Sequence, residues 1–141
     1  MASLLVVEDE PHIASGLRFN LEAEGHTVAV VDTGELALQR LAADHDQYDC
    51  IVLDVMLPGV DGFDVLQWCK TQPELEDLVI VVLSGFNGSR EVNQAYALGA
   101  DAFIVKPCRD IDLLNLLRQF PDHWLQQMPP AKPPRPRLYS R

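Results

Sequence analysis

The chain has 141 residues, of which 48% are hydrophobic and 23% charged, a balance typical of one globular domain. No apolar stretch approaches the ~20 residues of a membrane-spanning helix. The opening residues lack the basic region of a secretory signal. Three cysteines at scattered positions, without a CxxC pair, favour buried thiols in a reducing compartment. We therefore expect a soluble cytoplasmic protein.

The formal net charge is −10 and is unevenly distributed along the chain. The last 13 residues, 129–141, contain four basic residues and no acidic one, so the preceding residues together carry −14. A body this acidic argues against direct nucleic-acid binding, because it repels phosphates. It suits a site that binds a divalent cation or a surface that meets a basic partner.

Short runs rich in β-branched residues alternate along the chain with segments of helical period. Three of the runs are almost wholly apolar, as expected for strands buried on both faces of a parallel sheet. The expected strands are residues 4–7, 27–31, 50–53, 78–83 and 102–105. The expected helices begin at Pro11 and end before Gly25, run from about 35 to 43, begin near Gly62, run from 89 to 98, and begin near Asp110.

Apolar stripes support these helices, because each places large side chains at the spacing of one helix face. The first carries Ile13, Leu17 and Leu21, and the third carries Val65, Leu66 and Trp68. In the second helix, the side chains expected to face inward are Leu36, Ala37, Leu38 and Leu41.

Five consecutive strand–helix units predict a doubly wound α/β fold, with a parallel sheet and helices on both faces. Residues 1–124 form the predicted domain. A Pro/Arg-rich tail or linker is predicted over 125–141, because a proline-rich segment forms neither a helix nor a central strand. This tail is either a flexible terminus or a ligand for a proline-binding partner. In such sheets the binding site lies at the carboxyl ends of the strands.

Polar residues follow the strands at that edge: Glu8 and Asp9 after the first, then Asp54, Ser84 and Lys106. Each alone also fits a solvated turn, but together they bring three carboxylates, a hydroxyl and an ammonium to one rim. Three carboxylates repel one another unless a cation lies between them, and all-oxygen ligands favour Mg²⁺ or Mn²⁺ over Zn²⁺.

A carboxylate beside such a cation can act as a nucleophile and form an acyl phosphate. Asp54 is best placed for this role, because it comes from a central strand. The ammonium of Lys106 and the hydroxyl of Ser84 can each bind an oxygen of the incoming phosphoryl group. Glu8 and Asp9 are then the expected cation ligands.

Several motifs together resemble the bacterial response-regulator receiver domain, over about residues 3–122. The resemblance implies a chemotaxis-regulator-like, flavodoxin-like fold with a five-stranded parallel sheet of strand order 2-1-3-4-5 and five helices. It also implies that the chain is a phospho-acceptor in two-component signalling that catalyses only its own phosphorylation and dephosphorylation. The matching strings are LVVEDE at 5–10, DVMLPGVDG at 54–62, LSG at 83–85, LGADAF at 98–103 and VKP at 105–107.

The resemblance assigns roles around a bound Mg²⁺. Asp54 is similar to the phosphorylation site, which also ligates the metal, and Asp9 to a direct metal ligand. Glu8 resembles the other member of the acidic pair, which often binds through water. The third protein ligand is the backbone carbonyl at the position of Met56.

The resemblance also assigns the switch. Ser84 is similar to the family's switch hydroxyl, Phe103 to its switch aromatic and Lys106 to its phosphate clamp. The family typically has a cis peptide bond between the lysine and the following proline, here Pro107. A small Cys108 stands where the family usually has a bulky aromatic residue, which changes the expected packing but not the chemistry.

The implied partner is a sensor histidine kinase or a phosphotransfer protein, with no direct nucleic-acid or membrane contact from this chain. The implied output surface comprises the fourth helix, fifth strand and fifth helix. Apolar residues on more than one face of the helix from Asp110 have two explanations. They pack on the sheet, or they form, with the fourth helix, a surface for a homodimer or another partner.

Two other functions are compatible with the fold. A phosphorylation-independent interaction module would need none of the site residues, and the complete set argues against it. A phosphohydrolase of similar topology would need an acid or base two residues after the nucleophile. Met56 stands at that position and cannot serve.

Overall fold

The computed structural model describes residues 2–44, 46–85, 89–106 and 115. The predicted fifth helix, the Lys106–Pro107 peptide bond, Cys108 and the 125–141 tail lie outside these residues, apart from Asn115. Each observed strand begins and ends within one residue of the prediction. The strands are β1 (Ser3–Val7), β2 (Thr27–Val31), β3 (Cys50–Asp54), β4 (Val79–Ser84) and β5 (Ala102–Val105).

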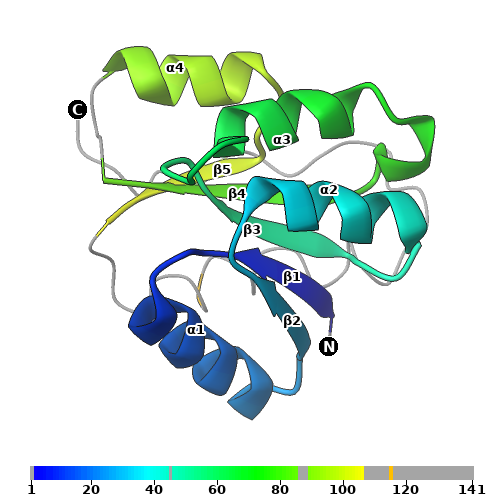
Figure 1. Ribbon diagram of the computed structural model, residues 1–141, viewed down its shortest axis with the longest axis vertical. Helices are drawn as coiled ribbons and strands as arrows, with labels where there is room; N and C mark the ends of the chain where they lie inside the picture. The colour runs from blue at the N-terminus through cyan, green and yellow to red at the C-terminus, as the bar shows by residue number, and fades with distance from the viewer. Residues whose placement is uncertain (1, 45, 86–88, 107–114, 116–141) are drawn as a thin grey trace.

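The strands form one parallel sheet in the order β2-β1-β3-β4-β5, which confirms the predicted topology. One face carries α1 (Pro11–Ala23), and the other carries α2 (Gly34–Ala43), α3 (Gly62–Lys70) and α4 (Ser89–Ala97) (Figure 1). A short 3₁₀ helix, Pro73–Leu75, leads into β4. In the described part of the chain, no helix has both the length and the apolar character needed to span a membrane.

Side chains cap the first three helices, α1, α2 and α3. The carboxylate of Glu10 accepts a hydrogen bond from the backbone N–H of His12, and Pro11 supplies a fixed φ at the first position of α1. Thr33 caps α2, and Asp61 and Asp64 form a capping box at α3.

Two apolar clusters fill the space on either side of the sheet, because alternate residues of a strand point to opposite faces. Leu4 and Val6 pack in the cluster under α1, whereas Leu5 and Val7 pack in the cluster under α2, α3 and α4. All of β3 and β4 is buried, as predicted for strands covered on both faces.

Two predicted core positions are wrong. Ile13 is 39% exposed and Leu36 is 41% exposed. In α1 the buried side is Ala14, Leu17 and Leu21, so Ile13 lies at the margin of the stripe. In α2 the buried residues are Gly34, Ala37 and Leu41, so Leu36 lies outside the buried stripe.

Candidate functional site

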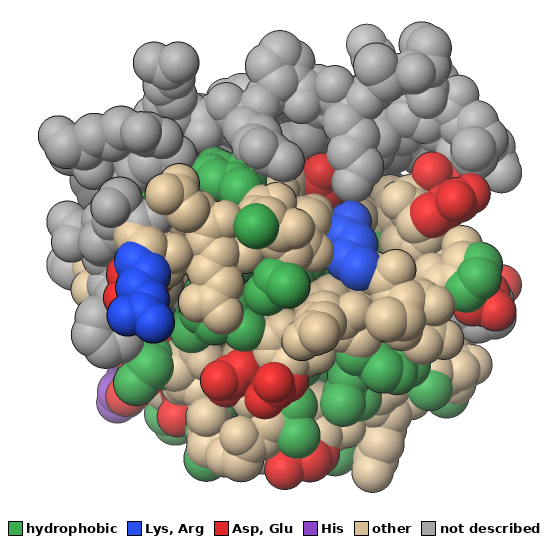
Figure 2. All heavy atoms as spheres, turned by 90° about the horizontal axis from the view of Figure 1, so that it is seen from above, with side chains coloured by type: hydrophobic (Ala, Val, Ile, Leu, Met, Phe, Trp, Pro, Cys, Tyr) green, Lys and Arg blue, Asp and Glu red, His purple; other side chains and the backbone are tan. Residues whose placement is uncertain are grey.

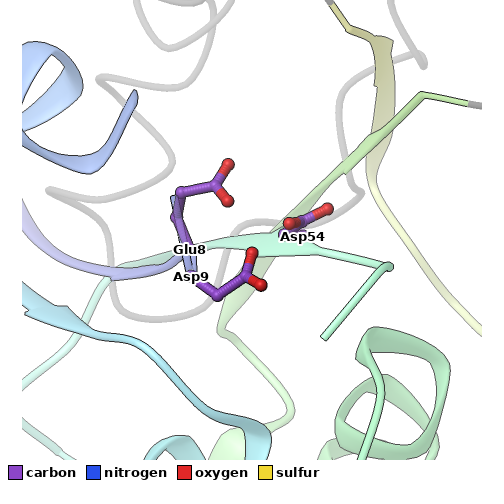
Figure 3. A group of neighbouring side chains, drawn as sticks. All are labelled: Glu8, Asp9 and Asp54. Atoms are coloured by element: carbon purple, nitrogen blue, oxygen red, sulfur yellow. The ribbon is translucent and has the colours of Figure 1, made fainter. Parts of the chain in front are cut away.

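The parallel register brings the predicted site residues to one edge of the sheet. Val7 pairs with Leu53, so Glu8 follows β1 at the level of Asp54 in β3. Ser84 pairs with Val105, which places Lys106 next along the same edge. Figure 3 shows the side chains of Glu8, Asp9 and Asp54 directed into a common space. One carboxylate oxygen from each of these three lies within 4.8 Å of the other two.

Strand alternation assigns these side chains to the two faces of the sheet. Glu8, Asp54 and Lys106 each come two residues after a strand residue of the cluster under α1, so they continue on that face. Asp9 has the opposite parity and is exposed, whereas Glu8 and Asp54 are each 1% exposed. The three preceding residues are Val6, Val52 and Ile104.

Backbone N–H groups occupy one oxygen of each buried carboxylate. Glu8 Oε2 accepts a hydrogen bond from the N–H of Glu10 at 3.2 Å. Asp54 Oδ1 accepts one from the N–H of Met56, also at 3.2 Å. The second oxygens, Glu8 Oε1 and Asp54 Oδ2, are left facing the ammonium of Lys106.

Lys106 bridges the two buried carboxylates. Its Nζ lies 2.9 Å from Glu8 Oε1 and 3.2 Å from Asp54 Oδ2, and its side chain is 21% exposed. Its backbone N–H donates to the carbonyl of Ser84 at 2.7 Å, which fixes the residue against the end of β4. A lysine in this position partly balances the carboxylates, and three carboxylates against one ammonium still leave an excess negative charge.

The pKa values of Glu8 and Lys106 are both raised, for different reasons. Burial raises the pKa of Glu8, and the nearby carboxylate of Asp54 adds to the rise, although the hydrogen bond from Lys106 opposes it. Burial alone would lower the pKa of Lys106. The acceptors Glu8 and Asp54 outweigh that effect, so the pKa of Lys106 is raised and its ammonium stays charged at neutral pH.

This donor set fits a hard divalent cation. All of the grouped ligand atoms are carboxylate oxygens, and neither nitrogen nor sulfur donors stand among them. Such a set favours Mg²⁺ or Mn²⁺, which accept several waters beside a few carboxylates. Met56, whose backbone carbonyl is the remaining predicted ligand, lies 57% exposed in the loop after β3.

The loop from Val55 to Gly62 closes on itself beside Asp54. The carbonyl of Val55 accepts hydrogen bonds from the N–H groups of Leu57 and Gly62, both at 3.0 Å. A Cβ at Gly62 would overlap the carbonyl oxygen of Asp54, so only glycine lets the start of α3 approach the acceptor strand this closely. Sequence reasoning recognised the glycine but not this contact.

Ser84 and Phe103 lie on the same face of the sheet. Phe103 pairs with Val82, and Ser84 follows Val82 by two residues, so the two predicted switch residues are diagonal neighbours on adjacent strands. Phe103 is fully buried and Ser84 is 1% exposed. Among the described residues beyond its chain neighbours, a Cβ at Gly85 would have no atom within 4 Å.

A doubly wound sheet with carboxylates at the ends of β1 and β3 defines an α/β protein with its site at the topological switch point. The sequence model of the response regulator receiver domain matches residues 4–118. The chain therefore belongs to the response regulator receiver domain family.

Two curated relatives illustrate the match. The transcriptional regulatory protein AfsQ1 of Streptomyces coelicolor is 40% identical over 107 residues, covering 76% of this chain and 45% of that protein. The phosphate regulon transcriptional regulatory protein PhoB of Rhizobium meliloti is 37% identical over 114 residues, covering 81% of this chain and 49% of PhoB. This chain thus spans about half the length of the curated relatives it matches.

Solved structures agree with the sequence relatives. The signal receiver domain of a signal transduction histidine kinase from Syntrophus aciditrophicus has a TM-score of 0.81 at 30% identity, covering 93% of this chain and 97% of that one. The chemotaxis response regulator CheY4 of Vibrio cholerae has a TM-score of 0.77 at 27% identity, covering 84% and 98%.

Proposed function

We propose that this receiver domain accepts a phosphoryl group on Asp54 from a phosphohistidine of a histidine kinase or phosphotransfer protein. The observation that carries the proposal is the position of Asp54 Oδ2. It lies 3.2 Å from the ammonium of Lys106, at the edge of the sheet where Glu8 and Asp9 also converge. A nucleophile placed beside a fixed cationic group reacts without reorganising its surroundings.

The chemistry assigned to the chain follows from this placement. An oxygen of Asp54 attacks phosphorus, the P–N bond of the donor breaks, and the imidazole nitrogen leaves with the electron pair. The ammonium of Lys106 and the hydroxyl of Ser84 bind the phosphoryl oxygens as they arrive. A bound Mg²⁺ or Mn²⁺, held by Asp9, Asp54 and the Met56 carbonyl, with Glu8 acting through water, would neutralise charge on those oxygens.

Hydrolysis of the acyl phosphate restores Asp54, so the domain performs no turnover beyond its own phosphorylation and dephosphorylation. Ser84 moves toward the phosphoryl group, and Phe103 adjusts in the space beside it. Because the two are diagonal neighbours on β4 and β5, this movement changes the adjoining surface of α4 and β5. The proposed domain covers residues 1–124 and acts in the cytoplasm, and 125–141 is its tail or linker.

The exposed residues of α4 indicate what kind of contact the proposed output surface can form. The exposed residues of α4 include Arg90, Asn93 and Gln94, whereas Val92 and Ala95 face the core. Figure 2 views the layer of α2, α3 and α4, and its described hydrophobic side chains form separate small areas among polar ones. A homodimer or partner that meets these described residues of α4 would therefore form hydrogen bonds and ion pairs with them.

Phosphorylation by a small donor such as acetyl phosphate tests the proposal. The native protein should incorporate one phosphoryl group in the presence of Mg²⁺ and none in the presence of EDTA. Asp54→Asn should abolish incorporation, whereas the control Asp77→Asn should not, because Asp77 is exposed near the opposite end of β4. Mg²⁺-dependent labelling of the Asp54→Asn protein would refute the assignment.

The alternative function, a phosphorylation-independent interaction module, predicts a different result in this labelling experiment. Such a protein would show no labelling and no change of Trp68 fluorescence on addition of Mg²⁺. A response of the half-buried Trp68, together with labelling, would exclude it.

A further inference from the structure

The first turn of α2 contacts the loop that follows the acceptor strand. Gly34 is the first residue of α2 and is buried. A Cβ at this position would overlap the carbonyl oxygen of Val60 and lie 3.0 Å from Val60 Cγ1. Gly34 has no positive φ, so the close approach of the loop, rather than the backbone conformation, requires glycine here.

The next residue of α2 contacts the same loop. Glu35 Oε2 would lie 2.6 Å from a Cβ at Gly59, whose φ is +72°. The carboxylate of Glu35 therefore rests against a turn that only a residue without a side chain adopts easily. Two consecutive residues of α2 thus contact two consecutive residues of the loop.

The two ends of this loop are fixed, so a displacement of its middle has little room to relax. At the start, Val55 donates its N–H to the carbonyl of Leu83 at 3.0 Å, and its carbonyl accepts from Gly62 at the end. The capping box of Asp61 and Asp64 then anchors the start of α3. A displacement of Val60, such as a Cβ at position 34 would cause, should therefore also move residues 56–59.

Met56 stands in the segment that would move. Its N–H donates to Asp54 Oδ1, so the position of the loop and the orientation of the acceptor carboxylate are linked directly. The backbone carbonyl of Met56 is also the proposed third protein ligand of the cation. Groups that hold metal ligands in place affect affinity although they do not touch the metal.

We propose that Gly34 and Glu35 are positioning residues for the divalent-cation site. The first turn of α2 holds the loop of residues 55–62 in the position at which the Met56 carbonyl can bind the cation and the Met56 N–H orients the Asp54 carboxylate. The inference rests on the proposed function, because it assumes that the cation binds at Asp9, Asp54 and Met56. It extends the functional site to a helix that contributes no ligand.

Calorimetric titration with Mg²⁺ alone tests the inference in the intact chain, with urea unfolding in EDTA as a separate measure of stability. Gly34→Ala should weaken Mg²⁺ binding about 10-fold. Gly85→Ala is the matched control, because a Cβ there meets no atom of the described residues beyond its chain neighbours within 4 Å, and it should leave the affinity unchanged. Loss of stability in Gly34→Ala with an unchanged Mg²⁺ affinity would show a merely structural role and overturn the inference.

Glu35 supplies a second test that does not depend on whether Gly34→Ala folds. Glu35 is exposed, so Glu35→Ala should keep the fold and weaken Mg²⁺ binding by removing the contact with Gly59. Glu35→Gln keeps the shape without the charge and should restore most of the affinity. Equal losses of Mg²⁺ affinity in Glu35→Ala and Glu35→Gln would show that Glu35 acts only through its charge, and would overturn the positioning role.

The native protein separates this inference from the proposed function. If the native chain binds no Mg²⁺, the proposed cation site fails and the inference fails with it. If the native chain binds Mg²⁺ and Gly34→Ala and Glu35→Ala both bind it equally well, only the inference fails.

Discussion

Removal of the ammonium that joins Glu8 to Asp54 gives the most direct test of the site's electrostatics. Lys106→Met keeps most of the length of the side chain but leaves two carboxylates, each 1% exposed, without their shared counter-ion. Breaking a fully buried pair typically costs about 3–5 kcal/mol. Because 21% of the Lys106 side chain is exposed, we expect a smaller loss, about 2–3 kcal/mol in the free energy of unfolding near pH 8.

The loss should depend on pH in a defined direction. The pKa of Glu8 is already raised above 4.5 by burial, and loss of the hydrogen bond from Lys106 raises it further. A carboxyl whose pKa is raised by folding stabilises the native state below its unfolded pKa, and this contribution disappears as the pH rises through the folded value. The loss of unfolding free energy in Lys106→Met should therefore be largest near pH 8 and become smaller toward about pH 5.

Urea unfolding in EDTA, with a double-mutant cycle of Lys106→Met and Glu8→Gln, measures the effect. The coupling free energy should be about 2 kcal/mol, because Glu8→Gln removes the charge that the lysine neutralises. Arg18→Met is the control, since its pair with Glu22 is exposed and should contribute at most about 0.5 kcal/mol. A coupling below about 0.5 kcal/mol, or a deficit independent of pH, would refute the reasoning.

Two further predictions concern groups away from the rim. Asp101 Oδ2 accepts a hydrogen bond from the buried N–H of Ile80 at 2.8 Å, so Asp101→Ala should lower the free energy of unfolding by about 1–3 kcal/mol. A urea midpoint equal to that of the native protein would contradict this. Burial raises the pKa of the Cys69 thiol to about 12 and that of Cys50 well above its usual value. Peptide mapping should therefore find both cysteines unmodified by iodoacetamide in the native protein and modified in urea, and rapid native labelling would contradict their burial.

The sequence predicted the convergence of the site residues because it depends only on strand direction. In a parallel sheet, carboxyl ends meet at one edge, so Glu8, Asp54, Ser84 and Lys106 had to lie close together once the strands were recognised. It did not predict that Glu8 is buried and Asp9 exposed. Alternation along β1 could not have given this difference, because Leu5 and Val7, which share the parity of Asp9, are as buried as Leu4 and Val6.

Other features depend on contacts between segments far apart in the chain. The bridge from Lys106 to Glu8 joins two strands that are not neighbours in the sheet, and it requires particular side-chain conformations. The approach of Val60 to Gly34 likewise depends on how α2 and a distant loop pack. The only local signal was a glycine as the first residue of a helix where no turn requires one.

The hydrogen bond from the Lys106 N–H to the Ser84 carbonyl links the backbones of the two proposed phosphoryl-binding residues. This 2.7 Å bond lies one residue beyond Ser84 and Val105, the last pair of β4 and β5, so neither backbone can move away without breaking it. We therefore expect the backbones of Ser84 and Lys106 to move together rather than independently. A local opening at this edge of the sheet would withdraw both groups in a single event.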